Sequence, residues 1–324
     1  MQELPTFVTR RNKHATGCWW LQVLEPVRAQ RHRRWVTLCV LCAAVMLGVL
    51  ATFGLVRDLL AARLQNPSAH ARGSEAAASS PLSQLKHLII VAGNAVYTGS
   101  NFASARDDHQ WYLEDYQKGQ GLVFLQHIRR GIEIAQADPQ ALLLFSGGKT
   151  RLEAGPLSEA ESYWRLASAQ AWYGHAEGVS GRVLTEDFAR DSFENLLFSI
   201  CRFRQLTGHY PRNITMISLE LKRKRIETQH RTAIRYPAAQ FRFISTEEAL
   251  HFGGPVPDSM PADRALAAFA TDPYGCLHEE LLEKRRKRNP FHVVIPYPSG
   301  CPEIARLIRY CGRNIFKGRL PWDP

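Results

Sequence analysis

The sequence lacks several features that would assign it to a familiar class of protein. It has no GxxxxGK[ST] spacing, so no P-loop is predicted. The only CxxC spacing, from Cys39 to Cys42, lies inside an apolar run, so nothing indicates a zinc site or any other metal site. No segment repeats at a fixed period. Hydrophobic residues make up 45% and charged residues 22% of the chain, which excludes disorder of the whole chain.

A dense basic face interleaved with aromatic residues is also missing, although the formal net charge is +11. Residues 1–34 hold seven Lys and Arg against two acids, so much of the charge lies in this tail. The runs from Lys222 to Arg225 and from Lys284 to Arg288 are short and alternate with acidic segments. Such runs are usually solvated helix faces, so no nucleic-acid partner is predicted.

One long apolar run is present, at residues 35–56, and it contains no charged residue. A helix of this length spans about 33 Å, enough to cross a hydrocarbon core of about 30 Å. A cleaved signal peptide is the alternative, but its apolar core is normally shorter and nearer the N-terminus. The sequence therefore predicts an integral, single-pass membrane protein: basic tail 1–34, transmembrane helix 35–56, flexible stem 57–84 and main domain 85–324, divided into a core 85–245 and an extension 246–324.

The orientation follows from the basic residues that crowd the N-terminal side of this run: Arg28, Arg31, Arg33 and Arg34. They favour a cytosolic tail and a lumenal main domain in the endomembrane system, a type II topology. The Asn213-Ile-Thr215 sequon fits a lumenal domain. Four cysteines in the main domain allow three disulfide pairings, and free buried thiols are at least as well supported: Cys201, Cys276, Cys301 and Cys311.

The main domain alternates apolar runs with helical patterns, which predicts a Rossmann-like α/β fold, a parallel sheet with helices on both faces. Strands are expected at 85–91, 141–145 and 214–219, with weaker candidates at 242–244 and 292–295. Helices are expected at 121–137, from a capping box at Ser158 and Glu161, and at 187–207 before Gly208.

Ligands of such sheets bind at the carboxyl ends of the strands, where three polar loops are expected. The first holds Gly93 and Asn94, the second runs from Ser146 to Arg151, and the third follows the strand at 214–219. Glycines in the second loop let the backbone approach a ligand, and its amides could face an anion. A turn that simply needs glycine explains them equally well. The candidate ligand-binding residues here are Asn94, Ser146, Gly147, Gly148, Lys149 and Arg225, with Lys222 as a candidate catalytic cation.

Acidic residues gather between the second and third strands. Glu159 and Asp187 fit the first turn of a helix, where acids complement the helix dipole. Glu186 follows the apolar step Val183-Leu184, where a loop residue could face the ligand, and Asn195 lies four residues after Asp191. A paired acid could act as a general base or bind a metal. Glu186 and Asp191 are therefore the candidate catalytic acids.

These motifs in this order resemble the SanA/YdcF/ElyC-like family, a domain of unknown function. They are a strand into Gly93, then FSGG, SEAESY, TEDFARDSFENLLFS and ISLELKRKR, spread over most of residues 85–235. The rest resembles the extension of a fungal, membrane-anchored branch. The matching polar positions are Gly93, Ser146, Gly147, Gly148, Glu159, Glu186, Ser192, Asn195 and Arg225.

Two positions depart from the family pattern. Ala189 stands where the family has a serine, and Lys222 stands where it has a histidine. The resemblance implies a Rossmann-like fold and, for bacterial members, a role in envelope or surface-polysaccharide biology. It brings no established reaction and no cofactor.

Two functions are therefore expected. The first is an enzyme that acts on an anionic nucleotide or sugar phosphate in glycan or envelope-related metabolism, with Glu186 as base. The second is a non-catalytic membrane-anchored binding or scaffold protein, which the loss of the family's serine and histidine favours.

Overall fold

The computed structural model describes Met46 and residues 81–246 and 260–324. By its internal contacts the chain divides into residues 1–76 and 77–324. The predicted basic tail, almost all of the predicted transmembrane helix and nearly all of the stem lie outside the described residues. Within the residues that are described, no helix has both the length and the apolar character that a membrane span requires.

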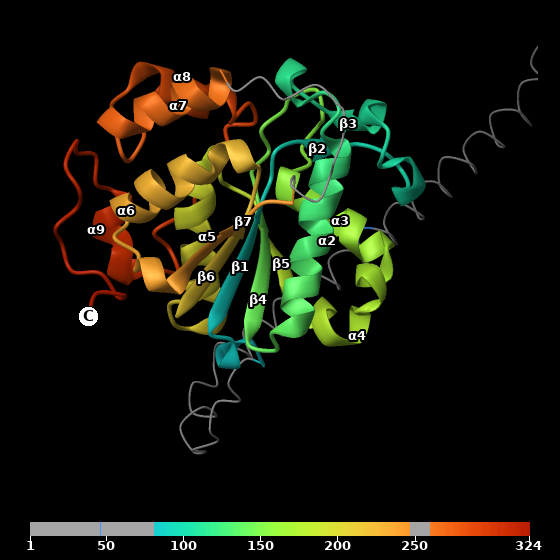
Figure 1. Cartoon of the computed structure of the whole chain (residues 1–324), viewed down its shortest axis with the longest axis horizontal. Coiled ribbons are helices and arrows are strands. Elements are labelled where there is room, and N and C mark those ends of the chain that lie inside the picture. Colours follow the sequence, from blue (N-terminus) through green and yellow to red (C-terminus); the bar gives the residue numbers. More distant parts are fainter. Residues whose placement is uncertain (1–45, 47–80, 247–259) are drawn as a thin grey trace, which may run out of the picture. The chain divides into compact units, whose positions relative to one another are not determined.

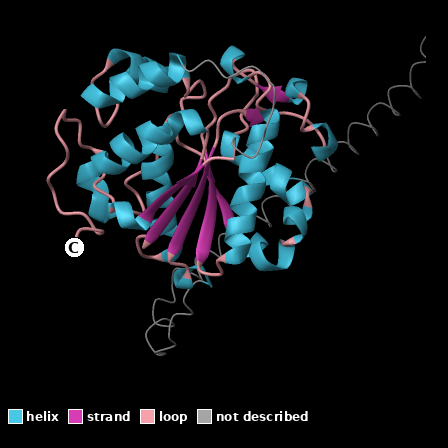
Figure 2. Ribbon diagram, viewed as in Figure 1, coloured by secondary structure: helices cyan, strands magenta, loops and turns pink. Residues whose placement is uncertain are grey.

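The core of the main domain is a five-stranded parallel sheet. Its order is β5-β4-β1-β6-β7, so the chain adds strands on one side of β1 and then crosses to the other. The strands are β1 (His87–Ala92), β4 (Ala141–Ser146), β5 (Val183–Glu186), β6 (Asn213–Ile217) and β7 (Phe241–Ile244). This is the doubly wound, Rossmann-like order, and Figure 2 shows helices on both sides of the sheet. The predicted Rossmann-like α/β fold of the main domain is confirmed.

The strands form because their residues are buried on both faces. In β1, Leu88 and Ile90 pack into one core, and Ile89 and Val91 pack into the other. All six residues of β4 are buried. A strand that is apolar at every position buries side chains on both of its faces, which is possible only in the middle of a sheet that is covered on both sides.

Helices cover the two faces in two groups. α2 (Gly121–Ala137), α3 (Glu159–Ala169) and α4 (Ala176–Val179) belong to one core. α5 (Ser192–Thr207) and the later helices belong to the other: α6 (Arg231–Ala233), α7 (Met260–Thr271), α8 (Glu279–Lys287) and α9 (Ala305–Ile308). Short helical turns complete the chain, among them η1 (Pro81–Gln84), η4 (Asp115–Gln117), η7 (Glu220–Lys222), the π-helix η8 (Arg225–His230) and η11 (Pro302–Ile304).

The carboxyl ends of the strands meet at one edge. Ala92 pairs with Ser146, and Ser146 pairs with Glu186, so three neighbouring strands end level with one another. In Figure 1 the strands rise from η1 at the bottom, and this edge lies at the top. α7, α8 and the antiparallel pair β2 (Val96–Tyr97) and β3 (Trp111–Tyr112) lie toward the same end.

Two element predictions are wrong. Residues 292–295 form no strand: Val294 is 84% exposed, and prolines at 290 and 296 flank the segment. α5 begins at Ser192 rather than at Asp187, because the side chain of Asp191 accepts a hydrogen bond from the Glu194 amide and thereby caps the helix. Its end is confirmed, since Gly208 adopts φ 85° there.

The four cysteines of the main domain form two disulfides, Cys201–Cys301 and Cys276–Cys311. Of the alternatives that the sequence left open, the structure therefore has one of the three disulfide pairings and not free thiols. Cys201 lies on α5 and Cys301 lies just before η11, so the first bond ties the C-terminal extension to the sheet-covering helix.

Candidate functional site

The first and third loops at the carboxyl edge are in contact. The ammonium group of Lys222 donates a hydrogen bond to the side-chain oxygen of Asn94. The backbone carbonyl of Asn94 accepts a hydrogen bond from Gln117 at 2.5 Å. Asn94 and Lys222 therefore lie together at the switch point between β1 and β6, as the order of the loops predicts.

In the second loop, the backbone amides of Gly147 and Gly148 donate hydrogen bonds to carbonyl groups of the protein itself. The Gly147 amide donates to the Glu186 carbonyl at 3.0 Å, and the Gly148 amide donates to the Ala189 carbonyl at 2.7 Å. An amide that is already paired in this way is not available to an anion. The predicted backbone cradle for an anion is therefore not formed by these two glycines.

Close packing by Glu159 explains why glycine stands at two of these positions. A Cβ at Gly93 or at Gly147 would lie 2.6 Å from Oε2 of Glu159. The other carboxylate oxygen of Glu159 accepts a hydrogen bond from Thr150 at 2.6 Å, so the side chain is held in place. Glu159 thus does more than complement a helix dipole, since it fills the gap between the ends of β1 and β4.

Gly147→Ala should therefore lower the free energy of unfolding by about 1–3 kcal/mol, the usual cost of overpacking. The measurement is urea unfolding of the full-length protein. Gly181→Ala is the matched control, because a Cβ at Gly181 meets nothing within 4 Å. Equal unfolding midpoints for Gly147→Ala and the unsubstituted protein would contradict this account of the contact.

Glu186 is buried, with 1% of its surface exposed. Its carboxylate accepts hydrogen bonds from Ser146 at 2.8 Å, from the Phe188 amide at 2.9 Å and from Tyr297 at 3.3 Å. Burial raises its pKa to about 8, because the low-dielectric surroundings penalise the charged form more than the donors stabilise it. The side chain sits below the edge of the sheet and lines neither of the cavities at this edge that are described below. Ser146 also lies within 3.2 Å of Asn195 Oδ1, so Asn195 belongs to this buried network.

Asp191 joins α5 to α8. It caps the Glu194 amide at 2.9 Å and pairs with Arg285 at 2.7 Å. Although burial alone would raise it, the Arg285 guanidinium holds the pKa of Asp191 below its ordinary value. Asp191 is thus committed to a structural ion pair that positions the N-terminus of α5.

Cationic side chains converge on a small cavity at the edge, here called the inner cavity, of about 40 Å³. Four cations line it, together with Tyr116 and Ser192: Lys222, Arg225, Lys284 and Arg288. No acidic residue lines it among the described residues. A space of this volume holds about three water molecules at most, so it admits only a small group.

Each cation of the inner cavity makes it less favourable for its neighbours to be protonated. Burial, followed by the charges of Arg225 and Arg288, lowers the pKa of Lys222 well below its ordinary value. Burial and the neighbouring Arg288 lower the pKa of Lys284 to about 7, and burial lowers that of Arg225 to about 10. An anion in the cavity would relieve this repulsion and restore the protonated lysines.

A wider pocket of about 380 Å³ adjoins the inner cavity and is here called the outer pocket. The two share Tyr116, Lys284 and Arg288. The outer pocket carries both signs of charge: its cations include Arg151, Arg264 and Lys287, and its acids are Glu114, Glu280 and Glu283. Its size lies within the usual range for small-molecule sites. The pair of cavities therefore suits a ligand with a compact anionic head and a larger polar remainder.

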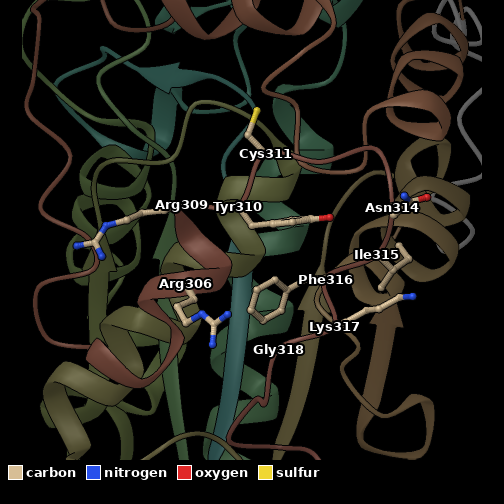
Figure 3. Close-up of a pocket in the computed structure, with 9 residues that line it drawn as sticks. All are labelled: Arg306, Arg309, Tyr310, Cys311, Asn314, Ile315, Phe316, Lys317 and Gly318. Atoms are coloured by element: carbon tan, nitrogen blue, oxygen red, sulfur yellow. The ribbon is translucent and has the colours of Figure 1, made fainter.

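A separate cavity of about 680 Å³ is built from residues 306–318 alone (Figure 3). It contains three cationic side chains, Arg306, Arg309 and Lys317. In Figure 3 the head groups of Arg309 and Lys317 point to opposite sides of the view rather than toward one point. Although this cavity is larger, its cations are not arranged to hold one anion, so the inner cavity is the better candidate site.

Ser192, the first residue of α5, links the inner cavity to a buried histidine. Its hydroxyl lies 2.9 Å from Nε2 of His230, and Arg225 Nε donates to the same hydroxyl at 3.1 Å. Burial lowers the pKa of His230 well below its ordinary value, so the ring is neutral. His230 could not be predicted as a site residue, because a lone histidine in η8 has no partner that the spacing of residues reveals.

Of the predicted site residues, the structure brings Asn94, Lys222, Ser192 and Arg225 to the edge that bears the inner cavity. Eight others form the packed base behind this edge: Gly93, Ser146, Gly147, Gly148, Glu159, Glu186, Asp191 and Asn195. Lys149 lines neither the inner cavity nor the outer pocket. Lys284 and Arg288 were missed, because their charge run on α8 was interpreted as a solvated face. Among the described residues, no group of three or more His, Cys, Asp or Glu side chains could hold a metal ion.

The fold and this site define a doubly wound α/β domain with a cationic cavity at the topological switch point. The chain is similar to a protein of the yeast Saccharomyces cerevisiae described as Uncharacterized protein YOR238W. The two are 28% identical over 297 residues, a match that covers 73% of this chain and 97% of the yeast protein. No protein-family model matches the chain, and no solved structure matches it.

Proposed function

We propose that the main domain binds a phosphate-bearing small molecule, of the nucleotide or sugar-phosphate class, with the phosphoryl group in the inner cavity. The observation that carries the proposal is the convergence of Lys222, Arg225, Lys284 and Arg288 on a space of about 40 Å³ with no acid on its walls. Burying four like charges is costly, and the nearby carboxylates of Asp191 and Glu159 offset that cost only in part. A phosphate dianion supplies a further counter-charge.

We also propose that the domain is lumenal, anchored by residues 35–56, and related to the SanA/YdcF/ElyC-like family. The two disulfides support an oxidising compartment, because disulfides are rare in the cytosol. Asn213, the predicted glycosylation site, is exposed at the start of β6, which is compatible with modification. A Rossmann-like sheet with the matching motifs at its carboxyl edge supports the relationship, and with it a role in glycan metabolism.

A second candidate function is binding without turnover, as in a membrane-anchored scaffold. The placement of Glu186 and Asp191 favours it, since neither candidate acid lines the inner cavity or the outer pocket and both are engaged in buried networks. The two functions share the cavity and differ only in whether the bound phosphoryl group reacts.

The test is the affinity of the purified full-length protein for inorganic phosphate, measured by calorimetry and by thermal shift. Arg288→Ala should weaken binding about 10- to 100-fold, as expected for the loss of one charge-assisted contact. Arg286→Ala is the matched control: Arg286 lies two residues earlier, on α8, its side chain is 62% exposed, and it lines neither cavity. If phosphate fails to bind, or if the two variants bind it equally, the proposed function is wrong.

A further inference from the structure

Ser192 occupies a position that no other hydroxyl on the wall of the inner cavity shares. It lines that cavity but not the outer pocket, whereas Tyr116, Lys284 and Arg288 line both. A phosphoryl group in the inner cavity would therefore lie between Ser192 and the remainder of the ligand. Attack on phosphorus with the leaving group on the far side needs this arrangement.

The hydrogen bonds around Ser192 direct its proton. Arg225 can only donate, so it occupies a lone pair of the Ser192 oxygen and leaves the hydroxyl proton for an acceptor. In the tautomer that carries its ring proton on Nδ1, Nε2 of His230 is the acceptor, at 2.9 Å from the hydroxyl oxygen. A nucleophilic hydroxyl is activated by a base at this distance, and a neutral imidazole can take the proton.

The surroundings of His230 suit a base whose basicity rises when the ligand binds. Its ring packs edge-on against Phe193 and Phe269, which exclude water from it. Arg225, Lys284 and Arg285 disfavour a positive charge on the ring, and Asp191 favours one. A phosphate dianion in the inner cavity offsets the cations and so raises the pKa of the imidazole toward a useful value.

We propose that Ser192 is a catalytic nucleophile that accepts the phosphoryl group of a phosphomonoester, with His230 as its general base. This rests on the proposed function, because the phosphate must first occupy the inner cavity. It deepens that function by naming the ligand as a substrate and the reaction as phosphoryl transfer.

The Ser192 oxygen forms a bond to phosphorus while its proton moves to Nε2 of His230, and the bond from phosphorus to the ester oxygen breaks. The leaving alkoxide takes a proton from Lys284, which faces both cavities and whose pKa of about 7 lets it donate near neutral pH. Water then attacks the phosphorus of the phosphoserine and gives a proton to Lys284, while the bond from phosphorus to the Ser192 oxygen breaks. His230 returns its proton to the Ser192 oxygen, so the net reaction is hydrolysis to alcohol and phosphate.

The four cations act on the charge of the transferring group. Lys222, Arg225, Lys284 and Arg288 surround the space in which its three outer oxygens would lie. Fixed positive charge in a partly dehydrated site stabilises such a transition state more strongly than water does. The same residues hold the substrate, so they do not by themselves distinguish binding from catalysis.

The experiment uses full-length protein and p-nitrophenyl phosphate, with release of nitrophenolate and phosphorylation of Ser192 followed by mass spectrometry after acid quenching. We expect turnover and a phosphorylated Ser192 in the unsubstituted protein. Ser192→Ala should abolish the adduct and slow turnover at least about 100-fold, while the affinity for inorganic phosphate changes by less than about 3-fold.

Two further variants separate a chemical role from a structural one. His230→Gln keeps a polar group of similar size but cannot take up a proton, so turnover should fall about 100-fold while phosphate still binds. The dependence on pH that comes from Lys284 should remain. Ser199→Ala is the matched control, a buried serine on the same helix with no hydrogen-bond partner among the described residues, and it should leave turnover unchanged.

The outcomes are distinguishable. If the unsubstituted protein fails to bind phosphate, the proposed function itself is wrong. If phosphate binds but no nitrophenolate is released, or if Ser192→Ala turns over at the unsubstituted rate, the nucleophile is wrong and the binding function stands.

Discussion

Replacing Cys201 and Cys301 together with alanine should lower the free energy of unfolding of the full-length protein by about 2–5 kcal/mol, the usual cost of losing a native disulfide. The bond joins residues 100 positions apart, so it restricts the unfolded chain strongly. A loop of this length corresponds to about 4.7 kcal/mol in the chain-entropy treatment. Both cysteines are fully buried, so their removal also leaves small cavities in the core.

Replacing Cys276 and Cys311 provides the internal comparison. These residues are 35 positions apart, and Cys311 is exposed, so both the entropic and the packing losses should be smaller. Denaturant unfolding of the two double variants under identical conditions measures the difference. If the Cys201 and Cys301 variant keeps the unsubstituted midpoint, the bond does not stabilise the folded state.

Glu186→Gln should change how stability depends on pH. The folded-state pKa of Glu186, about 8, lies above the ordinary value of 4.5, so the folded protein holds a proton that the unfolded chain releases. The stability from this proton is fully present below pH 4.5 and is lost as the pH rises to about 8. Glutamine is neutral throughout, so the variant should lack this loss.

The expected size of the effect is large. At about 1.4 kcal/mol for each pKa unit, the difference between the two values corresponds to at most about 5 kcal/mol between the acidic and the alkaline limits. The hydrogen bonds need not be lost, because the Ser146 hydroxyl also lies within 3.2 Å of the Asn195 side-chain oxygen and can turn toward it. Urea midpoints of both proteins from pH 5 to pH 8.5 give the measurement. Parallel curves would mean that Glu186 is already ionised in the folded state.

The sheet could be predicted because its signal is local. Ala141–Ser146 is apolar enough to be read as a central strand without knowledge of its neighbours, and α2 matched its predicted bounds. The segment at 292–295 is also largely apolar, but it pairs with no strand among the described residues, and its flanking prolines remove backbone donors. Whether an apolar run pairs with a neighbour is a tertiary fact that its own residues do not encode.

Only the site residues that directly follow strands of the sheet could be predicted from the sequence. Asn94, Lys222 and Arg225 follow strands that flank the switch point, so topology alone places them together. Lys284 and Arg288 come from a helix beyond the last strand, and nothing in a charge run says which side of the helix is covered. Glu159 packs against two glycines and Glu186 joins a buried hydrogen-bond network. Both roles depend on contacts between strands, which the spacing of residues along the chain does not reveal.

α8 and the residue that follows it complete the inner cavity, so two stretches of chain on either side of residues 247–259 line one candidate site. Lys222 and Arg225 come from the sheet side, and Lys284 and Arg288 come from the extension. Any ligand that bridges them is thermodynamically linked to the docking of α8 on the sheet, and each must strengthen the other by the same factor. A bound ligand would then make local unfolding of the extension less favourable, and a variant that loosens the extension would bind the ligand more weakly.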